Sequence, residues 1–411
     1  MAKGPLSRVR VLDMSRILAG PWAAQMLADL GAEVIKIERP GKGDDSRQFG
    51  PPFLKDAEGR NTRESSFYIS TNRNKKSLSC DISKPEGQAL IRALVAKCDV
   101  LLENYKVGDL KRYGLDYDSL KSVNPKLIYC SLTGFGQTGP YSPRPGYDSI
   151  FQAMGGLMSI TGLPDDVAGG GPMKTGPSLA DILAGQYAAY AIQAALYARD
   201  MQGEPGQHID VSLLDSLIAS TSHYASQYLI SGEVPVRRGT EGNGGMPSRM
   251  FRCADGDIMI VAGNNEQYAR FCDVLGHPEL TGDERFAEIA LRVVNRRALG
   301  EVFEPLIGQW RLHDLLAALD EAGVPAGPIN TLEQVFADPH VQSRNMCVEA
   351  SHSLSADGKV KLVANPVKFS GTPIVDYKAP PIQGEHTQQI LRELLGMEDT
   401  AVQNLRSKGI V

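Results

Sequence analysis

Asp181 is the acid whose setting, GPSLADILAGQ, is best suited to chemistry. Small and apolar residues fill almost every position from Leu179 to Arg199, which predicts a buried helix with Asp181 in its first turn. Free backbone N–H groups and the helix dipole stabilise a carboxylate as an anion at that position. Glycines at 169–171 and 176 would let backbone amides approach a substrate carbonyl closely. Asp181 is therefore a candidate catalytic carboxylate, with a helix-capping acid as the alternative.

Basic residues follow two predicted strands in the first third of the chain. Arg39 comes after the strand expected at 34–38, and Lys106, Lys111 and Arg112 follow the one at 99–103. Ligands of a parallel sheet bind beyond the carboxyl ends of its strands, where these cations would meet a phosphate-bearing ligand. For Lys111 a solvated surface position is favoured. For Arg39 and Arg112, ligand contact and a solvated surface stay equal alternatives.

A glycine run at Gly242, Asn243, Gly244 and Gly245 is a candidate substrate loop. A hinged loop of this kind can cover an active site and exclude water from hydrolysable intermediates. An interdomain linker is the alternative interpretation.

Other catalytic patterns find little support. The segment GFGQTG at 134–139 matches GxGxxG after a strand, but Pro140 blocks the helix that would hold a pyrophosphate. The seven histidines lie in no hydrolase motif, and the six cysteines are scattered without a CxxC pair. We therefore expect no metal, no redox cofactor and no disulfide framework.

Short β-branched runs alternate with helical patterns in the first third, which predicts a doubly wound, Rossmann-like α/β domain. The expected strands are 9–13, 34–38, 77–81, 99–103 and 127–133, and the expected helices 21–30 and 85–97. This large domain covers 1–225. A smaller α/β domain covers 226–330, with a strand at 258–261 and helices near 266–275 and 312–322. Residues 331–411, with a strand near 359–363 and a helix at 387–395, are expected to return to the large domain.

The net charge and the N-terminal sequence limit the expected binding partners and the expected cellular compartment. With 411 residues and a net charge of -5, the chain has no bulk electrostatic attraction to nucleic acid or acidic membranes. The N-terminus lacks the apolar core of a signal peptide, and no window is apolar enough for a membrane span. We expect a cytoplasmic protein, with the mitochondrial matrix as the alternative in a eukaryote.

Six segments in order resemble the class III CoA-transferases (the CaiB/BaiF family), which include formyl-CoA transferase, carnitine CoA-transferase and α-methylacyl-CoA racemase. They are VRVLDMSRILAGPWAAQMLADLGAEVIKIERPGKGD at 9–44, NRNKKSLSCD at 72–81, ENYKVGDLKRYGL at 103–115, LIYCSLTGFGQTGPY at 127–141, SLADILAGQYAA at 178–189 and GVPAGPIN at 323–330. The resemblance implies a homodimer of interlocked rings and a nucleophilic Asp181. It also implies a coenzyme A site lined by Arg39, Asn104, Tyr105, Lys106 and Arg112.

Within the family, the segments at 43–53, 262–268 and 291–297 are most similar to the branch that uses succinyl-CoA with glutarate or hydroxymethylglutarate. The racemase branch works by proton transfer with a His and Asp pair, and the chain has that adjacency only at His313–Asp314, far from the shared motifs. Formyl-CoA:oxalate transfer is a further alternative, although Asn243 interrupts the pure glycine run of that enzyme. A non-catalytic CoA-binding protein is the remaining one.

The expected chemistry is covalent, because two carboxylic acids cannot exchange a thioester in water without losing it to hydrolysis. Asp181 would carry the acyl group as a mixed anhydride and CoA as a thioester. Backbone N–H groups near Gly156 or in the 242–245 loop are candidates to stabilise the oxyanions. The remote carboxylate of a diacid would need a fixed cation, for which the candidates are Arg47, Lys174 and Arg249.

Overall fold

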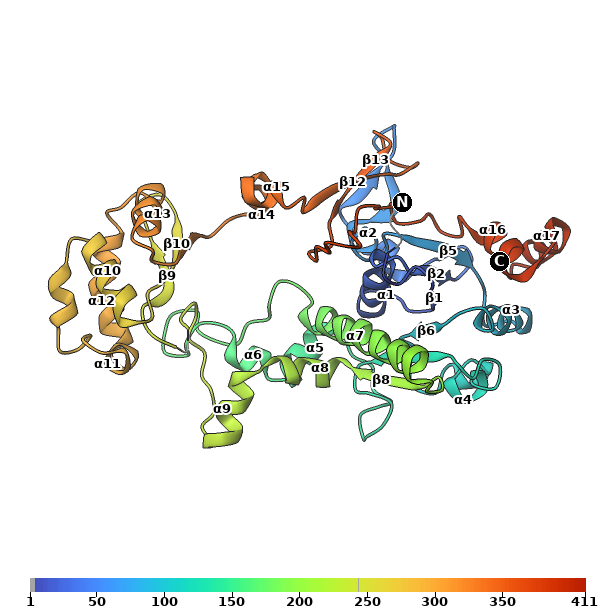
Figure 1. Ribbon diagram of the computed structural model, residues 1–411, viewed down its shortest axis with the longest axis horizontal. Coiled ribbons are helices and arrows are strands. Elements are labelled where there is room, and N and C mark those ends of the chain that lie inside the picture. The colour runs from blue at the N-terminus through green and yellow to red at the C-terminus, as the bar shows by residue number, and fades with distance from the viewer. Residues whose placement is uncertain (1–3, 243) are drawn as a thin grey trace. The chain divides into compact units, whose positions relative to one another are not determined.

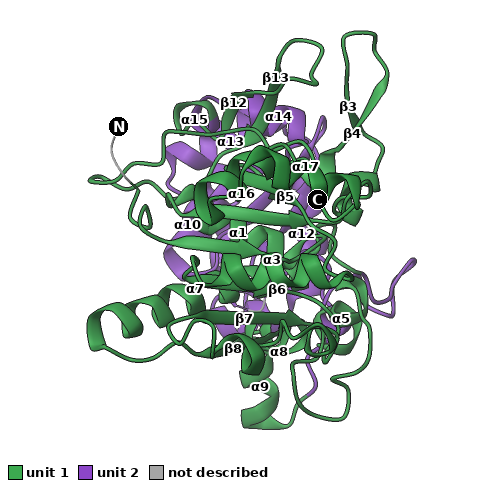
Figure 2. Ribbon diagram, turned by 90° about the vertical axis from the view of Figure 1, so that its right-hand side faces the viewer, with its two compact units in different colours: residues 1–157, 174–233, 342–411 green, residues 158–173, 234–341 purple. Residues whose placement is uncertain are grey.

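The computed structural model describes residues 4–242 and 244–411 (Figure 1). The chain divides into two compact units, which Figure 2 colours separately. Unit 1 comprises the ranges 1–157, 174–233 and 342–411, and unit 2 comprises 158–173 and 234–341. The domain boundaries expected from the sequence, at residues 225 and 330, stay predictions.

Unit 1 is built on a six-stranded sheet in which every neighbouring pair is parallel. Its strands are β1 (Arg10–Asp13), β2 (Glu33–Glu38), β5 (Lys75–Ser79), β6 (Val100–Glu103), β7 (Ile128–Thr133) and β8 (His208–Ser212). Their order, β5-β2-β1-β6-β7-β8, reverses direction between β1 and β6, as in a doubly wound sheet. The predicted α/β fold with a parallel sheet is confirmed, and β8 is a strand that sequence reasoning missed.

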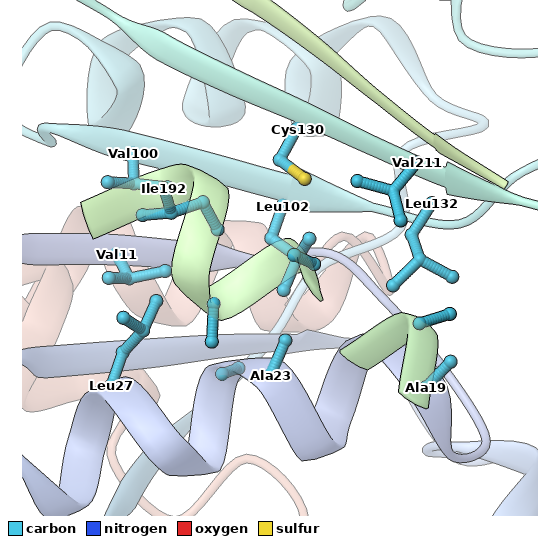
Figure 3. Close-up of a cluster of buried hydrophobic side chains, with 14 of the residues drawn as sticks. Val11, Ala19, Ala23, Leu27, Val100, Leu102, Cys130, Leu132, Ile192 and Val211 are labelled. Atoms are coloured by element: carbon cyan, nitrogen blue, oxygen red, sulfur yellow. The ribbon is translucent and has the colours of Figure 1, made fainter. Parts of the chain in front are cut away.

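Both faces of the sheet are covered, because alternate side chains of each strand point to opposite sides. On one face, α1 (Ala19–Asp29) and α7 (Leu179–Gln202) pack on Val11, Val100 and Leu102 (Figure 3). Gly185 lets these helices approach closely, since a Cβ at this position would lie 2.6 Å from the carbonyl oxygen of Ala19. This contact brings the first turn of α7 beside the start of α1.

The other face is covered by α3 (Pro85–Val95), α16 (Thr387–Leu395) and α17 (Asp399–Ser407). Their side chains pack on Leu12, Ile35 and Leu101 of the sheet. The remaining helices of unit 1 are α2 (Ser66–Thr71), α4 (Tyr117–Leu120), α5 (Asp148–Met154), α8 (Leu213–Ser220) and α9 (His223–Ser231). It also contains 3-10 turns at Asp45–Gln48 and Lys111–Tyr113, and the strand pairs β3 (Phe53–Lys55) with β4 (Asn61–Ser65) and β12 (Cys347–Ser351) with β13 (Lys359–Val363).

Unit 2 has an antiparallel sheet in the order β11-β10-β9, packed with helices around its own apolar core. Its strands are β9 (Ser248–Arg252), β10 (Asp257–Val261) and β11 (Ala326–Pro328). Its helices are α10 (Asn265–Val274), η3 (Pro278–Gly282), α11 (Ile289–Val294), α12 (Arg296–Ile307), α13 (Leu312–Glu321) and α14 (Leu332–Ala337). The short helices α6 (Leu157–Ile160) and α15 (Pro339–Ser343) span chain positions where the units change.

None of the helices within residues 4–242 and 244–411 combines the length and apolarity needed to cross a membrane. In the same residues, no three His, Cys, Asp or Glu side chains are grouped so that they could hold a metal ion.

Candidate functional site

A pocket of about 220 Å³ lies in unit 1 at the point where the strand order reverses. Its walls come from the turn after β1, the segment after β6, the end of β7, the loop before α5 and the first turn of α7. The lining residues are Arg16, Ile17, Leu18, Ala19, Asn104, Tyr105, Lys106, Val107, Leu132, Thr133, Gly134, Ser142, Pro143, Arg144, Pro145, Gly146, Tyr147, Asp181 and Leu213. This is where open α/β sheets bind their ligands.

Asp181 is the one carboxylate among the described residues that line this pocket. It lies in the first turn of α7, half-buried, and the backbone N–H of Ala19 stabilises its charged form and so lowers its pKa. Burial, together with the negative charge of Asp148, raises the pKa of Asp181 to about 7. A desolvated carboxylate that still reaches the pocket is suited to act as a nucleophile.

Asp148 is a functional candidate that sequence reasoning missed. It is buried at the start of α5, and its Oδ1 accepts from the backbone N–H of Ala180, 2.8 Å away, in the first turn of α7. Gln152 donates to its other oxygen at 2.6 Å and accepts from the backbone N–H of Thr175 at 2.9 Å. Asp148 therefore holds the helix end that carries Asp181 and raises the pKa of its carboxyl. The sequence did offer a signal for Asp148. It is an acid at the start of a short helical pattern that ends at the Gly155–Gly156 pair.

The turn between β1 and α1 is strained and held by distant side chains. Ile17 has a φ of 73°, which for a β-branched residue costs on the order of 1–3 kcal/mol. The amide of Asn104 accepts from the N–H of Arg16 at 2.8 Å and donates to its carbonyl at 2.7 Å. Asn104 lines the pocket, and its side-chain amide joins the turns after β1 and β6. Its contact with coenzyme A stays a prediction.

Tyr105 and Lys106, directly after Asn104, also line the pocket. The backbone N–H of Tyr105 donates to Glu103 at 2.7 Å, and burial raises the pKa of that carboxyl to about 7. The guanidinium of Arg16 lies 5.1 Å from the centre of the Tyr105 ring. Lys106 is exposed at the pocket rim. These residues bring a cation and an aromatic side chain to the pocket lining.

Arg39 and Arg112 do not line this pocket. Arg39 is exposed directly after β2. Arg112, in the 3-10 turn after β6, is 3.6 Å from Asp109 and lies over the ring of Tyr113. Both follow strands of the same sheet edge, and their contact with coenzyme A stays a prediction.

The loop from Ser142 to Tyr147 is shaped by glycines packed on one aromatic ring. A Cβ at Gly134 or Gly146 would lie 2.5 or 2.3 Å from the ring of Phe151. The chain after GFGQTG runs as a loop to α5, and it places Arg144 and Tyr147 at the pocket.

The predicted substrate loop belongs to unit 2, and Asn243 lies outside the described residues. The N–H of Gly242 donates to the carbonyl of Ser248 at 2.9 Å. A Cβ at Gly245 would lie 1.9 Å from the carbonyl oxygen of Gly263, so Gly245 has a packing role, whereas Gly244 is exposed with no atom near such a Cβ. A role of this loop as a lid stays a prediction.

The structure corrects the assignment of Arg47 as a cation for a substrate carboxylate. Arg47 is 1% exposed, and its guanidinium bonds Glu38 at 2.7 Å and Glu64 at 2.6 Å, so it is a core residue that cannot reach a ligand. Lys174 is exposed and donates to the carbonyl of Thr175, and it does not line the pocket. Arg249 belongs to unit 2 and pairs with Glu304 and Glu241. Gly156, a predicted oxyanion donor, is also outside the lining.

Three cations, Arg16, Lys106 and Arg144, share the pocket with Asp181. Such a site attracts an anionic ligand and offers it one desolvated carboxylate. The described lining residues include no histidine, so the pocket lacks the usual partner for proton transfer at carbon.

Comparison with known proteins identifies relatives over nearly the whole chain. The model of "CoA-transferase family III" matches residues 6–387. The chain is 47% identical to the succinate–glutarate CoA-transferase of Agrobacterium fabrum, over 97% of this chain and 98% of that protein. It is 42% identical to the human succinyl-CoA:glutarate CoA-transferase, over 99% and 90% of the two chains. A crystal structure of a CAIB/BAIF family protein from Brucella suis superposes with a TM-score of 0.85 at 44% identity, covering 96% and 100%.

Proposed function

The chain belongs to CoA-transferase family III, and from this premise we propose that it transfers coenzyme A from succinyl-CoA to glutarate with Asp181 as the nucleophile. The observation that carries the proposal is the position of Asp181, the one carboxylate of the described pocket lining, at the switch point of the sheet. The names of two relatives at 42% and 47% identity support this choice of acids.

The reaction starts when a carboxylate oxygen of Asp181 attacks the thioester carbon of succinyl-CoA. The C–S bond breaks, CoA leaves as a thiolate and a succinyl–aspartyl anhydride remains. The thiolate then attacks the aspartyl carbonyl carbon, which releases succinate and leaves CoA on Asp181 as a thioester. Glutarate attacks this thioester, forms a second anhydride and frees the thiolate. Attack of the thiolate on the glutaryl carbonyl yields glutaryl-CoA and restores the Asp181 carboxylate.

The Ala19 N–H is proposed to serve the two steps in which the aspartyl carbonyl is attacked. In the free enzyme it stabilises the charged form of the Asp181 carboxyl. An aspartyl oxygen carries the developing negative charge each time the aspartyl carbonyl is attacked. A fixed donor at such an oxygen is typically worth about 3 kcal/mol of transition-state stabilisation.

Coenzyme A is proposed to lie along the sheet edge, with its thioester at Asp181. Lys106 and Tyr105 line the pocket, and Arg39 and Arg112 are proposed to meet the phosphates farther out. The pocket volume of about 220 Å³ suits the thioester end of the cofactor, because a whole drug-sized ligand takes at least about 300 Å³. The interlocked homodimer and the compartment stay predictions.

The covalent intermediate can be detected by intact mass spectrometry after incubation with succinyl-CoA. We expect a CoA-sized adduct, and hydroxylamine or borohydride should trap the activated carbonyl on Asp181. An Asp181→Ala variant is the control and should give neither product. If no acyl-CoA from a panel yields an adduct, the proposal is wrong, and deuterium exchange at the α-carbon would then test racemisation.

Arg144 is proposed to bind the remote carboxylate of the diacid. Among the pocket cations, Arg16 pairs with Asp45 at 3.0 Å, whereas Arg144 has no ion-pair partner among the described residues and stacks on Tyr141. Arg144→Ala should raise KM for glutarate about 10- to 100-fold, the loss of one charged hydrogen bond of about 1.5–3 kcal/mol. Pentanoate, which lacks the second carboxylate, and the Arg144→Lys variant are the matched controls. An equal loss with pentanoate would contradict the assignment.

A further inference from the structure

A buried ion pair, Lys36 with Asp44, lies beneath the turn that lines the pocket. The Lys36 Nζ and an Asp44 carboxylate oxygen are 2.7 Å apart, and both side chains are 0% exposed. Burying two charges is costly, and a buried pair often adds no stability over apolar residues of similar volume. A buried pair beneath a pocket wall can instead serve to fix the backbone conformation of that wall.

Both members of the pair bind the backbone of the β1–α1 turn. The Lys36 Nζ donates to the carbonyl of Ser15 at 2.9 Å, and the Asp44 Oδ1 accepts from the N–H of Ile17 at 3.1 Å. The N–H of Asp44 itself donates to Glu38 at 2.9 Å, which fixes its position. The pair therefore holds both sides of the left-handed Ile17, a conformation that a β-branched residue keeps only when its surroundings impose it.

The conformation of Ile17 affects the orientation of the Ala19 N–H. Ile17 and Ala19 line the same pocket as Asp181, and the Ala19 N–H stabilises the charged form of the Asp181 carboxyl. If Ile17 relaxed to a negative φ, the backbone before Ala19 would rotate and this N–H would no longer point at Asp181. Small displacements of a catalytic group cost about 100-fold in rate.

We propose that the Lys36–Asp44 ion pair is a positioning device that imposes the Ile17 conformation and thereby aims the Ala19 N–H at Asp181. The inference rests on the proposed function, in which Asp181 is the nucleophile. Lys36 and Asp44 do not line the pocket, so they act through the backbone of the turn.

The test is the double variant Lys36→Met/Asp44→Asn, which removes both charges together and leaves no unpaired buried ion. We expect kcat to fall about 30- to 100-fold with KM for succinyl-CoA changed less than threefold. The acid limb of kcat/KM should also move to higher pH, because the Ala19 N–H lowers the pKa of Asp181 and its loss lets that pKa rise. A purely structural pair would not move this limb.

The matched control is Arg73→Met/Asp29→Asn, which removes a buried ion pair at the other end of α1. It should lower the melting temperature while kcat stays within threefold. A second variant, Ile17→Gly, in the Lys36→Met/Asp44→Asn background should recover part of the lost kcat, because glycine adopts the required φ without strain. Equal kcat losses in the test and control pairs, or no recovery with Ile17→Gly, would overturn the proposal.

If the double variant does not fold, Lys36→Met/Asp44→Ser replaces it. Serine keeps a capping oxygen for the turn at Asp45–Gln48, and this pair of substitutions also removes both charges together. The same fall in kcat and alkaline shift are expected, and a kcat within threefold of the parent overturns the inference. An Asp181→Asn variant assayed in parallel separates the two levels. If Asp181→Asn still catalyses CoA transfer, the proposed function fails. If Asp181→Asn is inactive but the Lys36 and Asp44 variants keep the parent kcat, only this inference fails.

Discussion

Asp181→Asn is expected to lower kcat for CoA transfer by about 10⁴-fold or more, to the background of the assay, because removing a covalent nucleophile closes the pathway. The amide has the same shape and can still accept from the Ala19 N–H, so the turn and α7 should keep their positions. The measurement is initial rate of glutaryl-CoA formation from succinyl-CoA. Retention of more than about a hundredth of the activity would mean that another group carries the acyl chain.

The same substitution has an opposite expected effect on stability, which separates lost chemistry from lost fold. The folded pKa of Asp181, about 7, lies above its ordinary value of 3.8, so the folded protein prefers the neutral carboxyl. Stability of the parent should therefore fall as pH rises from about 4 to about 7. Asp181→Asn is neutral throughout, so its melting temperature should exceed that of the parent at pH 8 and match it at pH 4. A lower melting temperature at pH 8 would indicate a folding defect instead.

The pH dependence of the parent enzyme is the second large expected effect. In the proposed mechanism Asp181 must be ionised to attack, so with a pKa of about 7 the value of kcat/KM should fall about tenfold per pH unit below pH 7. At pH 5 it should be about one hundredth of the plateau. The acceptor acid titrates lower, as ordinary carboxyls do near pH 4, so the limb reports on the enzyme. A flat profile from pH 5 to 8 would contradict the raised pKa.

Asp148→Asn tests the cause of that pKa. Removing the negative charge near Asp181 stabilises its carboxylate, so the acid limb should move to lower pH by about one unit. The asparagine oxygen can still accept from the Ala180 N–H, which keeps the start of α7 in place. Asp215→Asn, at an exposed first-turn acid of α8, is the matched control and should leave the limb unchanged. A shift toward higher pH would show that Asp148 acts by positioning alone.

The candidate site was predictable where one segment carries the signal. Asp181 stands in the first turn of a helix whose small residues mark it as buried, and the pattern places both correctly at Leu179–Gln202. The strands after which Arg39 and Asn104 come were predicted to within one residue, since β-branched runs bounded by turns are local features. The glycine segment at 134–139 was correctly interpreted as a loop because of Pro140.

The sequence by itself determined the α/β class, the parallel strands and the position of the candidate carboxylate at a helix start, because hydrophobic periodicity and helix-start residues are local features of the chain. Only the tertiary structure decided what surrounds that carboxylate. The electrostatic influence of Ala19 and Asp148 on Asp181, and the ion pair of Lys36 with Asp44, depend on how separate elements pack. The tertiary structure also showed that Arg47 is buried in ion pairs with Glu38 and Glu64. The sequence could not show this, because a charged residue gives the same local pattern on the surface as in a buried ion pair. The surrounding charges, which set the pKa of Asp181, are brought together by the fold.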